Sequence, residues 1–322
     1  MRAREYSVLF ALGLIWGASF LFIKISVEDM PPAAVVLLRL LFSVVTLALV
    51  VAIRPSLVAG WRQFWRLGIM VGLINNVIPY LLITWGETRI ASGVASILNA
   101  ATPLFTVLLA HWWNSSANEP LTARRVSGVL VGFLGVGVLV GPSAFQFGGS
   151  DASTAIGELA VLVAAAAYGV GALMSRSYKG SASLVAPMTT QVASLVIMLP
   201  ITLLWGLPTH MPSAGALLSV AELGILGTAL AYLLYFWLIQ HVGATRTSLV
   251  TYLLPCTALL WGALFQSEQI SWNALAGLVL VLVGTTLTNG TLSFLRGHPA
   301  RRDGAAPVVT SSSPVTSGTA GE

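Results

Sequence analysis

Charged residues are scarce in this sequence, and their scarcity excludes most classes of soluble protein. Only 8% of the 322 residues are Asp, Glu, Lys or Arg, whereas 56% are hydrophobic. A soluble domain carries about 25% charged residues, so this chain has too few to build a water-facing surface. The surface that lacks charge must face lipid, and the sequence predicts an integral membrane protein.

Cysteine is nearly absent too. The single thiol, Cys256, can form no disulfide within the chain and no cysteine-based metal cluster. The sequence also has no His/Cys metal-ligand set, phosphate-binding loop, nucleophile–base pair or soluble nucleotide-binding domain. We therefore expect neither an enzyme nor an ATP-driven pump, and no cofactor or metal. The net charge of +5 lies between apolar runs, so we expect no nucleic-acid partner.

Long apolar runs dominate the remainder of the chain. A transmembrane helix needs about 20 mainly apolar residues. Continuous rather than alternating apolar runs favour helices over a β-barrel. The expected fold class is therefore an all-α membrane protein with ten transmembrane helices. The ten candidate runs are 7–24, 33–53, 66–85, 91–113, 125–142, 156–175, 183–206, 216–240, 245–266 and 272–290.

The basic residues predict how these runs are oriented. If the N-terminus is cytoplasmic, the outer segments hold only Lys24 and Arg89, and Arg39 lies inside the second run. Such an asymmetry is typical of the positive-inside rule. We expect a multi-pass protein of the cell inner (plasma) membrane, with both termini cytoplasmic and the lipid bilayer as a partner. The 13 basic residues then on the cytoplasmic side are Arg2, Arg4, Arg54, Arg62, Arg66, Arg124, Arg125, Arg176, Lys179, Arg246, Arg296, Arg301 and Arg302.

An internal repeat divides the chain into two similar halves, residues 5–142 and 156–291. Each half holds five apolar runs. Because five is odd, the second half must enter the membrane from the opposite side, and inverted repeats of this kind are typical of secondary transporters. Residues 297–322, rich in Gly, Ala, Pro, Ser and Thr, are expected to form a disordered cytoplasmic tail. Pairs that match at an offset of 152 residues include Tyr80 with Tyr232, Trp85 with Trp237, Ser96 with Ser248, and Pro103 with Pro255.

Short segments in both halves carry a family resemblance. They resemble the EamA-type members of the drug/metabolite transporter superfamily over about residues 5–290. The resemblance implies ten helices, a central cavity and transport of small metabolites or drugs, often outward. The segments are Leu14-Ile15-Trp16-Gly17-Ala18-Ser19-Phe20, Pro32 followed by Arg39, Ala91 to Pro103, and Glu119-Pro120-Leu121-Thr122 leading to Gly128, then Tyr168-Gly169, Gln191, Pro255 and Glu268. The family usually places Gly before the acidic residue, where this chain has Asn118 and Ser267.

Arg39 is the sharpest candidate for a substrate-binding residue. A charge about six residues into an apolar run is costly in hydrocarbon and is expected to face the protein interior or a hydrated cavity. Arg39 would then attract an anionic substrate group or anchor a carboxylate; alternatively, it snorkels to the outer interface or pairs with Glu28 or Glu87. Gln191 occupies the matching position of the second half and is a second candidate.

Deep amides and aromatic side chains complete the candidate substrate site. Amides within a span need partners, which are either the substrate or neighbouring helices. Aromatic rings would stack on an aromatic or cationic substrate, or simply pack. The candidates are Asn75, Asn76, Asn99, Trp16, Tyr80, Tyr168, Trp237 and Tyr252. Three prolines, Pro79, Pro103 and Pro255, are candidate hinges because proline frees a backbone carbonyl inside a helix.

The sequence favours a secondary transporter that exports small metabolites, amino acids or drug-like compounds by alternating access. The alternative is a nucleotide-sugar or phosphometabolite exchanger of the same fold, which would need more basic residues facing the cavity than Arg39 and Lys24. Glu158 and Glu222 are either proton-coupling or interfacial groups. The expected partners are a small-molecule substrate and, as a candidate, a second copy of the chain in a homodimer.

Overall fold

Apolar helices make up the protein. The computed structural model describes residues 1–113, 122–141 and 150–289, and these ranges contain no β-strand. The expected tail over 297–322 and the turn at Asn118 and Glu119 lie outside the described residues. The helices are α1 (Ala3–Val27), α2 (Pro32–Ile53), α3 (Trp65–Gly72), α4 (Ile78–Gly86), α5 (Ser92–Asn99), α6 (Thr102–Trp113), α7 (Ala123–Val140), α8 (Ser150–Ser175), α9 (Val185–Trp205), α10 (Ala214–Gly224), α11 (Ala231–Val242), α12 (Ala244–Thr247), α13 (Val250–Phe265) and α14 (Trp272–Asn289).

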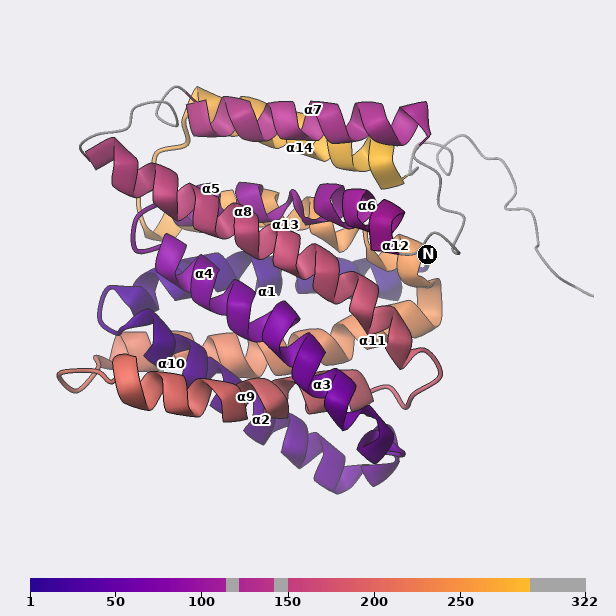
Figure 1. Ribbon diagram of the computed structural model, residues 1–322. Helices are drawn as coiled ribbons and strands as arrows, with labels where there is room; N and C mark the ends of the chain where they lie inside the picture. Colours follow the sequence, from indigo (N-terminus) through magenta and orange to yellow (C-terminus); the bar gives the residue numbers. More distant parts are fainter. Residues whose placement is uncertain (114–121, 142–149, 290–322) are drawn as a thin grey trace, which may run out of the picture.

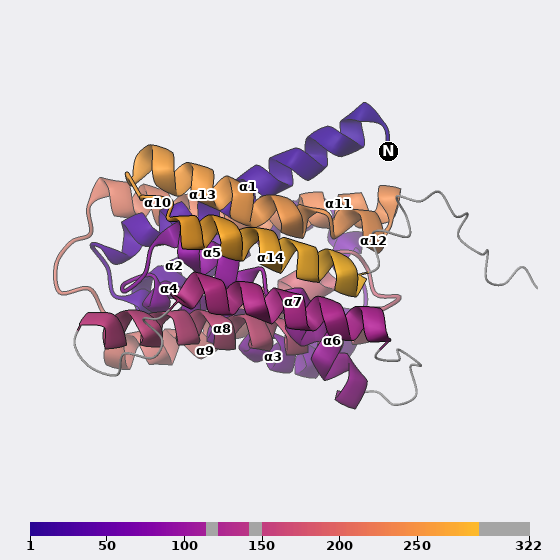
Figure 2. The ribbon, with the colours of Figure 1, turned by 90° about the horizontal axis from the view of Figure 1, so that it is seen from above.

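Within the residues that the structure describes, eight helical segments are long and apolar enough to cross a membrane. Two further apolar helices, Val250–Phe265 and Trp272–Thr288, are shorter. Each of the apolar runs in the sequence coincides with helix, so the all-α membrane fold is confirmed, whereas ten spans remain a prediction. The helices run roughly along one direction; α7 and α14 pair at one flank of the bundle in Figure 1 and lie side by side nearest the viewer in Figure 2.

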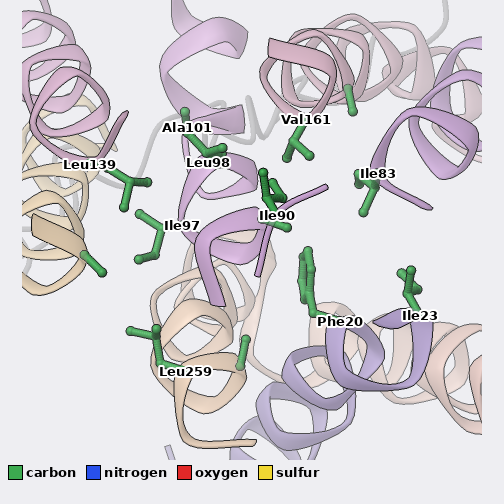
Figure 3. Close-up of a cluster of buried hydrophobic side chains, with 14 of the residues drawn as sticks. Phe20, Ile23, Ile83, Ile90, Ile97, Leu98, Ala101, Leu139, Val161 and Leu259 are labelled. Atoms are coloured by element: carbon green, nitrogen blue, oxygen red, sulfur yellow. The ribbon is translucent and has the colours of Figure 1, made fainter. Parts of the chain in front are cut away.

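The interior of the bundle is filled by apolar side chains from both halves of the chain. Figure 3 shows Phe20 of α1, Ile83 of α4, Ile90, Val161 of α8 and Leu259 of α13 pointing into one buried cluster. Lipid is as apolar as this cluster, so burial of apolar area cannot by itself hold such helices together. Close packing and polar contacts must contribute instead.

Glycines supply the close packing. A Cβ added at Gly68 would lie 2.8 Å from Cβ of Thr189, and one at Gly72 would lie 2.8 Å from the Thr190 carbonyl oxygen. Both partners belong to α9, so α3 meets α9 almost backbone to backbone. Small residues permit this approach, which maximises dispersion contacts in lipid.

We expect Gly128→Ala to weaken the pairing of α7 with α14. The added Cβ would lie 2.7 Å from the Gly284 carbonyl oxygen and 2.8 Å from the Thr288 nitrogen, and a backbone cannot yield as a flexible side chain does. Overpacking of this kind costs about 1–3 kcal/mol. The matched control is Gly137→Ala in the same helix, where no atom lies within 4 Å of the new Cβ. Thermal melts in detergent should show a lower midpoint for Gly128→Ala alone.

Two π-helical segments interrupt the third and eighth predicted spans at equivalent places. They are η3 (Leu73–Val77), between α3 and α4, and η6 (Ile225–Leu230), between α10 and α11. Their first residues differ by the 152 positions that relate the two halves of the sequence. π-helical turns are rare and occur frequently at functional sites. The two segments therefore mark a region in which each half departs from regular helix.

The prolines differ in their local effect. Pro79 lies in the first turn of α4, directly after η3. Pro103 begins α6 after a short interruption that separates α5 from α6. Pro255 lies inside the uninterrupted helix α13, and the corresponding interruption falls earlier, between α12 and α13. The two halves are thus not symmetric at these candidate hinges.

Candidate functional site

Arg39 lies inside the protein and not at a lipid interface. Its side chain is buried in α2, and its Nε donates a hydrogen bond of 3.0 Å to Oγ1 of Thr228 in η6. The guanidinium carbon lies 4.1 Å from the ring centroid of Tyr80, which is a cation–π geometry. A buried charge needs such partners because its desolvation is otherwise uncompensated. Of the positions that the sequence left open for this cation, the structure has the buried one, and the bond to Thr228 was not predicted.

Three tyrosines from different helices gather beside this guanidinium. Tyr80 of α4, Tyr168 of α8 and Tyr232 of α11 lie close enough to one another for their hydroxyl groups to interact. Arg39 lies within electrostatic range of both Tyr168 and Tyr232. The Glu222 carboxyl group of α10 also lies within electrostatic range of Arg39. We call these six residues the Arg39 cluster: Arg39, Tyr80, Tyr168, Glu222, Thr228 and Tyr232.

Sequence reasoning missed two members of the Arg39 cluster, although a signal for both was present. Tyr232 is the repeat partner of the candidate Tyr80, and Thr228 is the repeat partner of the candidate Asn76, each at an offset of 152 residues. Transferring every first-half candidate to the second half would have named them. Conversely, the repeat correctly paired Arg39 with another buried residue, Gln191.

The amide candidate Asn76 of η3 holds helices together. Nδ2 of Asn76 donates to Oγ of Ser194 at 3.1 Å, and the Ser194 hydroxyl donates to the Gly72 carbonyl at 3.0 Å. Within the described ranges, both amide atoms of the fully buried Gln191 and Oδ1 of Asn76 have no hydrogen-bond partner. Buried amides without partners are costly, so this second polar region is suited to bind water or a polar group.

Asn75 packs against α8, whereas Asn99 lies at the end of α5. The side chain of Asn75 fills the space beside Gly171 of α8, where an added Cβ would lie 2.7 Å from Cβ of Asn75. Asn75 therefore contributes to packing of η3 against α8. Asn99 ends α5 at the interruption before α6, and its carbonyl accepts a bond of 2.8 Å from Thr102.

Trp16 and Trp237 do not join the Arg39 cluster. They pack in a separate apolar group with Leu12 and Leu238. Trp16 meets Tyr235 with ring centroids 5.6 Å apart. Trp237 stacks on His241 and lies beneath the guanidinium of Arg4 at 5.1 Å. Tyr252 lies on α13, next to a residue that lines the cavity described below.

A cavity of about 290 Å³ lies toward one end of the bundle, which we call the Arg176 end. Five of its ten lining residues carry a hydroxyl group, and two are arginines. Gly169 packs against Phe105 and Thr106, so the cavity wall at Thr106 lies next to the chain at Tyr168 of the Arg39 cluster. The lining residues are Thr102, Pro103, Thr106, Val107, Ala110, Arg125, Arg176, Ser248, Thr251 and Thr288.

The opposite end, which we call the Lys24 end, is sealed by polar contacts. Nζ of Lys24 donates to the carbonyl oxygens of Glu87 at 2.7 Å and Ile90 at 3.0 Å, which ties α1 to the α4–α5 connection. The Asp29 carboxylate accepts a hydrogen bond from the Ser213 backbone nitrogen at the start of α10. The Lys24 contacts lie within the first half, whereas the Asp29 contact joins a first-half segment to a second-half segment across the end of the bundle.

Glu268 forms the strongest of the contacts at the Lys24 end. Its carboxylate accepts bonds from the Ser92 nitrogen at 2.7 Å, the Ser92 hydroxyl at 3.0 Å and the Gly93 nitrogen at 3.1 Å. It therefore caps α5 from the α13–α14 connection, satisfying amides that a helix N-terminus leaves unpaired. An added Cβ at Gly262 would collide with this carboxylate, so a glycine is required there.

The backbone at Ser267 explains why glycine suits the position before this acidic residue. Ser267 has φ of 52°, the only positive value for a non-glycine residue in the described ranges. We expect Ser267→Gly to stabilise the protein by about 0.5–1 kcal/mol, since relief of left-handed strain exceeds the extra entropy of glycine. Gln266→Gly, where φ is −111°, should destabilise instead. Thermal melts of the two variants in detergent would show shifts of opposite sign.

Comparisons with known proteins agree with this architecture. The EamA-like transporter family matches residues 4–141 and again 155–290. The "Uncharacterized transporter YoaV" of Bacillus subtilis is 25% identical over 287 residues, which cover 88% of this chain and 96% of that protein. The "Uncharacterized inner membrane transporter YedA" of Escherichia coli is 24% identical over 298 residues, covering 89% and 93%. A crystal structure with 22% identity superposes with a TM-score of 0.64 over 92% of this chain and 99% of the other, which supports the fold. The chain is thus a multi-pass membrane protein that belongs to the EamA-like transporter family.

Proposed function

We propose that the protein is a secondary transporter that carries small molecules across the membrane by alternating access, with the Arg39 cluster as its substrate site. The observation that carries the proposal is a charged and hydroxyl-rich cluster inside the bundle, with polar contacts closing the Lys24 end and a cavity at the Arg176 end whose wall at Thr106 packs against the residue after Tyr168. Such polar groups inside a membrane bundle are costly and are retained where a solute must be bound.

The arrangement of contacts supports two inverted five-helix repeats within ten spans. α2 of the first half packs on η6 of the second, and α9 of the second half packs on η3 of the first. Arg39 and Gln191 are the matching residues of α2 and α9. Exchange of equivalent contacts between halves is what a pseudo-twofold axis produces, and it allows the two packings to swap roles in transport.

The distribution of basic residues supports a cytoplasmic Arg176 end and cytoplasmic termini. Arg125 and Arg176 line the cavity at this end, whereas Lys24 and Arg89 lie toward the other. Under the positive-inside rule the cavity then faces the cytoplasm, and the structure represents an inward-facing state. A cytoplasmic entry site suits an exporter.

The chemistry of the Arg39 cluster suits small solutes that carry an anionic group together with polar or aromatic parts. One cation, three phenols and amides nearby can bind a metabolite, an amino acid or a drug-like compound. A nucleotide-sugar or phosphometabolite exchanger would need several cations. In the described part of the cluster Arg39 supplies one, and the Lys24 ammonium is bound to backbone carbonyls at the seal.

Reconstitution in liposomes tests the proposal. We expect saturable, ATP-independent counterflow of at least one compound from a panel of amino acids, small metabolites and cationic dyes. The panel would be run with and without a pH gradient, and protein-free liposomes are the control. A chain that inserts correctly but exchanges no compound, or that opens a non-saturable pore, would contradict a transporter.

A further inference from the structure

Glu87 is a buried acidic residue that the proposed substrate site does not use. It follows the last residue of α4 at the Lys24 end, and its side chain is 0% exposed. In the described part of the chain, neither of its carboxyl oxygens has a hydrogen-bond partner. An ionised carboxylate is rarely left in this condition, because burial removes hydration and nothing replaces it.

The charged groups around Glu87 are all engaged elsewhere. Lys24 of α1, Arg39 of α2 and Glu268 of the α13–α14 connection lie within electrostatic range. The Lys24 ammonium is bound to the backbone carbonyls of Glu87 and Ile90, and the Arg39 Nε to Thr228. The Glu268 carboxylate caps α5 and repels a second negative charge.

The helix α8 also packs against α4 and carries a buried acid of its own. This is Glu158, whose Oε2 has no hydrogen-bond partner in the described ranges. No electrostatic interaction among the described residues joins it to Glu87. Glu158 is therefore a second buried carboxyl group at the Lys24 end, since its neighbour Gly157 packs against Gly86 and Ile90, and the experiment has to separate its contribution from that of Glu87.

Burial decides the protonation state of Glu87. Desolvation raises the pKa of its carboxyl group well above the usual range, and this outweighs the opposing attraction of Lys24 and Arg39. The neutral form therefore predominates while the Lys24 end is sealed. If the same carboxyl group met water, its pKa would return toward about 4.3.

We propose that Glu87 holds a proton while the Lys24 end is closed and releases it to the outer solution when that end opens, so that external pH controls the opening. The inference rests on the proposed function, which supplies the open state, and goes beyond it by assigning a coupling ion and its site. One O–H bond breaks on opening and the proton passes to water, so no other reactant is required.

The sign of the pH effect follows from linkage. The closed state binds the proton more tightly than the open state, so closure is favoured fully at pH below the open-state pKa of about 4.3. That advantage is lost progressively as the outer pH rises toward the raised pKa of the closed state. Alkaline outer solution should therefore open the Lys24 end, by up to about tenfold per pH unit.

Accessibility of an engineered cysteine measures this opening. The single native cysteine, Cys256, is first replaced by serine. Met30→Cys reports on the seal, because Met30 is 3% exposed at the Lys24 end, and Thr88→Cys is an exposed reference at the same end. The ratio of their reaction rates with an impermeant maleimide, measured in proteoliposomes from about pH 5 to about pH 9, removes the intrinsic pH dependence of thiol chemistry.

We expect this ratio to rise at least about tenfold with pH when Glu87 is present. Glu87→Gln, a permanently neutral isostere, should hold the ratio at its low-pH value, and Glu87→Asp should restore the rise. Glu158→Gln removes the other buried carboxyl group at this end, and the part of the rise that depends on Glu87 should persist in it. A flat ratio in the parent protein, or an unchanged rise in Glu87→Gln, would overturn the proposal.

Counterflow measured on the same proteoliposomes separates this proposal from the transporter itself. Counterflow with a flat accessibility ratio rejects Glu87 as the proton site and leaves transport standing. A pH-dependent ratio that disappears in Glu87→Gln, without any counterflow, supports the proton switch and contradicts the proposed function. Size-exclusion profiles and thermal melts identify any variant that fails to fold, in which case Glu87→Asp alone decides by retaining or losing the rise.

Discussion

Replacing Arg39 with alanine should lower the rate of substrate counterflow about 100-fold. The guanidinium offers a substrate anion a charge-assisted hydrogen bond of about 1.5–3 kcal/mol, and about 2.7 kcal/mol corresponds to a factor of 100. The counterflow rate of Arg39→Lys should lie between those of the parent protein and Arg39→Ala, because an ammonium keeps the charge but lacks the planar guanidinium that stacks on Tyr80. Initial rates in proteoliposomes, normalised to inserted protein, provide the measurement.

Two controls separate a loss of binding from a loss of folding in this experiment. Arg89→Ala removes a cation that binds the Trp85 carbonyl and lies over the Trp85 ring, away from the Arg39 cluster, and it should change the rate less than about twofold. Arg39→Ala with Glu222→Gln removes both the cation and the half-buried carboxyl group within its electrostatic range, so it should recover thermal stability without recovering flux. Normal flux in Arg39→Ala would mean that the substrate site lies elsewhere.

Replacing Glu268 with alanine should destabilise the protein by about 3 kcal/mol. The carboxylate satisfies two backbone amides and one hydroxyl at the start of α5, and hydrogen bonds to a charged group contribute about 1.5–3 kcal/mol each without being additive. The midpoint of thermal unfolding should fall by about 6–12 °C. Because the bond joins the two halves at the Lys24 end, the same variant should also raise the accessibility of Met30→Cys.

Glu5→Ala is the matched control for this substitution. Glu5 also caps a helix, since its carboxylate accepts a bond of 2.7 Å from the Arg2 nitrogen at the start of α1, but in an exposed position. Exposed caps contribute about 0.5–1 kcal/mol. If the two variants melt at equal temperatures, Glu268 does not tie the two halves together.

The sequence predicted the helical segments well, because a lipid environment requires each membrane-crossing segment to be a long, continuous run of apolar residues. A run of about 20 apolar residues must be helical to satisfy its own backbone, so the positions of α1, α2, α8 and α9 follow from composition alone. The internal repeat was visible for a similar reason, since Tyr80 and Tyr232 occur in identical tripeptides. Arg39 was found because a charge inside an apolar run is conspicuous.

The rotation of each helix was not predictable in the same way. A helix in a membrane is apolar toward lipid and toward its neighbours, so its sequence carries little information about which face points inward. Trp16 and Tyr168 were both assigned to the cavity, yet only Tyr168 reaches Arg39, while Trp16 packs on Tyr235. Glu87 was considered from the sequence only as an alternative partner of Arg39. Its burial was not predictable, because it arises at a place where segments far apart in the chain meet, such as Lys24 and the α4–α5 connection.

The hydroxyl of Thr228 links the guanidinium of the proposed substrate site to the backbone of the π-helical segment η6. It accepts a hydrogen bond from Arg39 and donates one of 2.8 Å to the carbonyl of Leu223, five residues earlier, within the wide turn of η6. A solute that captures the guanidinium competes with Thr228 for its donor. In the proposed site, binding of a solute would therefore change the hydrogen bonding of the main chain between α10 and α11 directly.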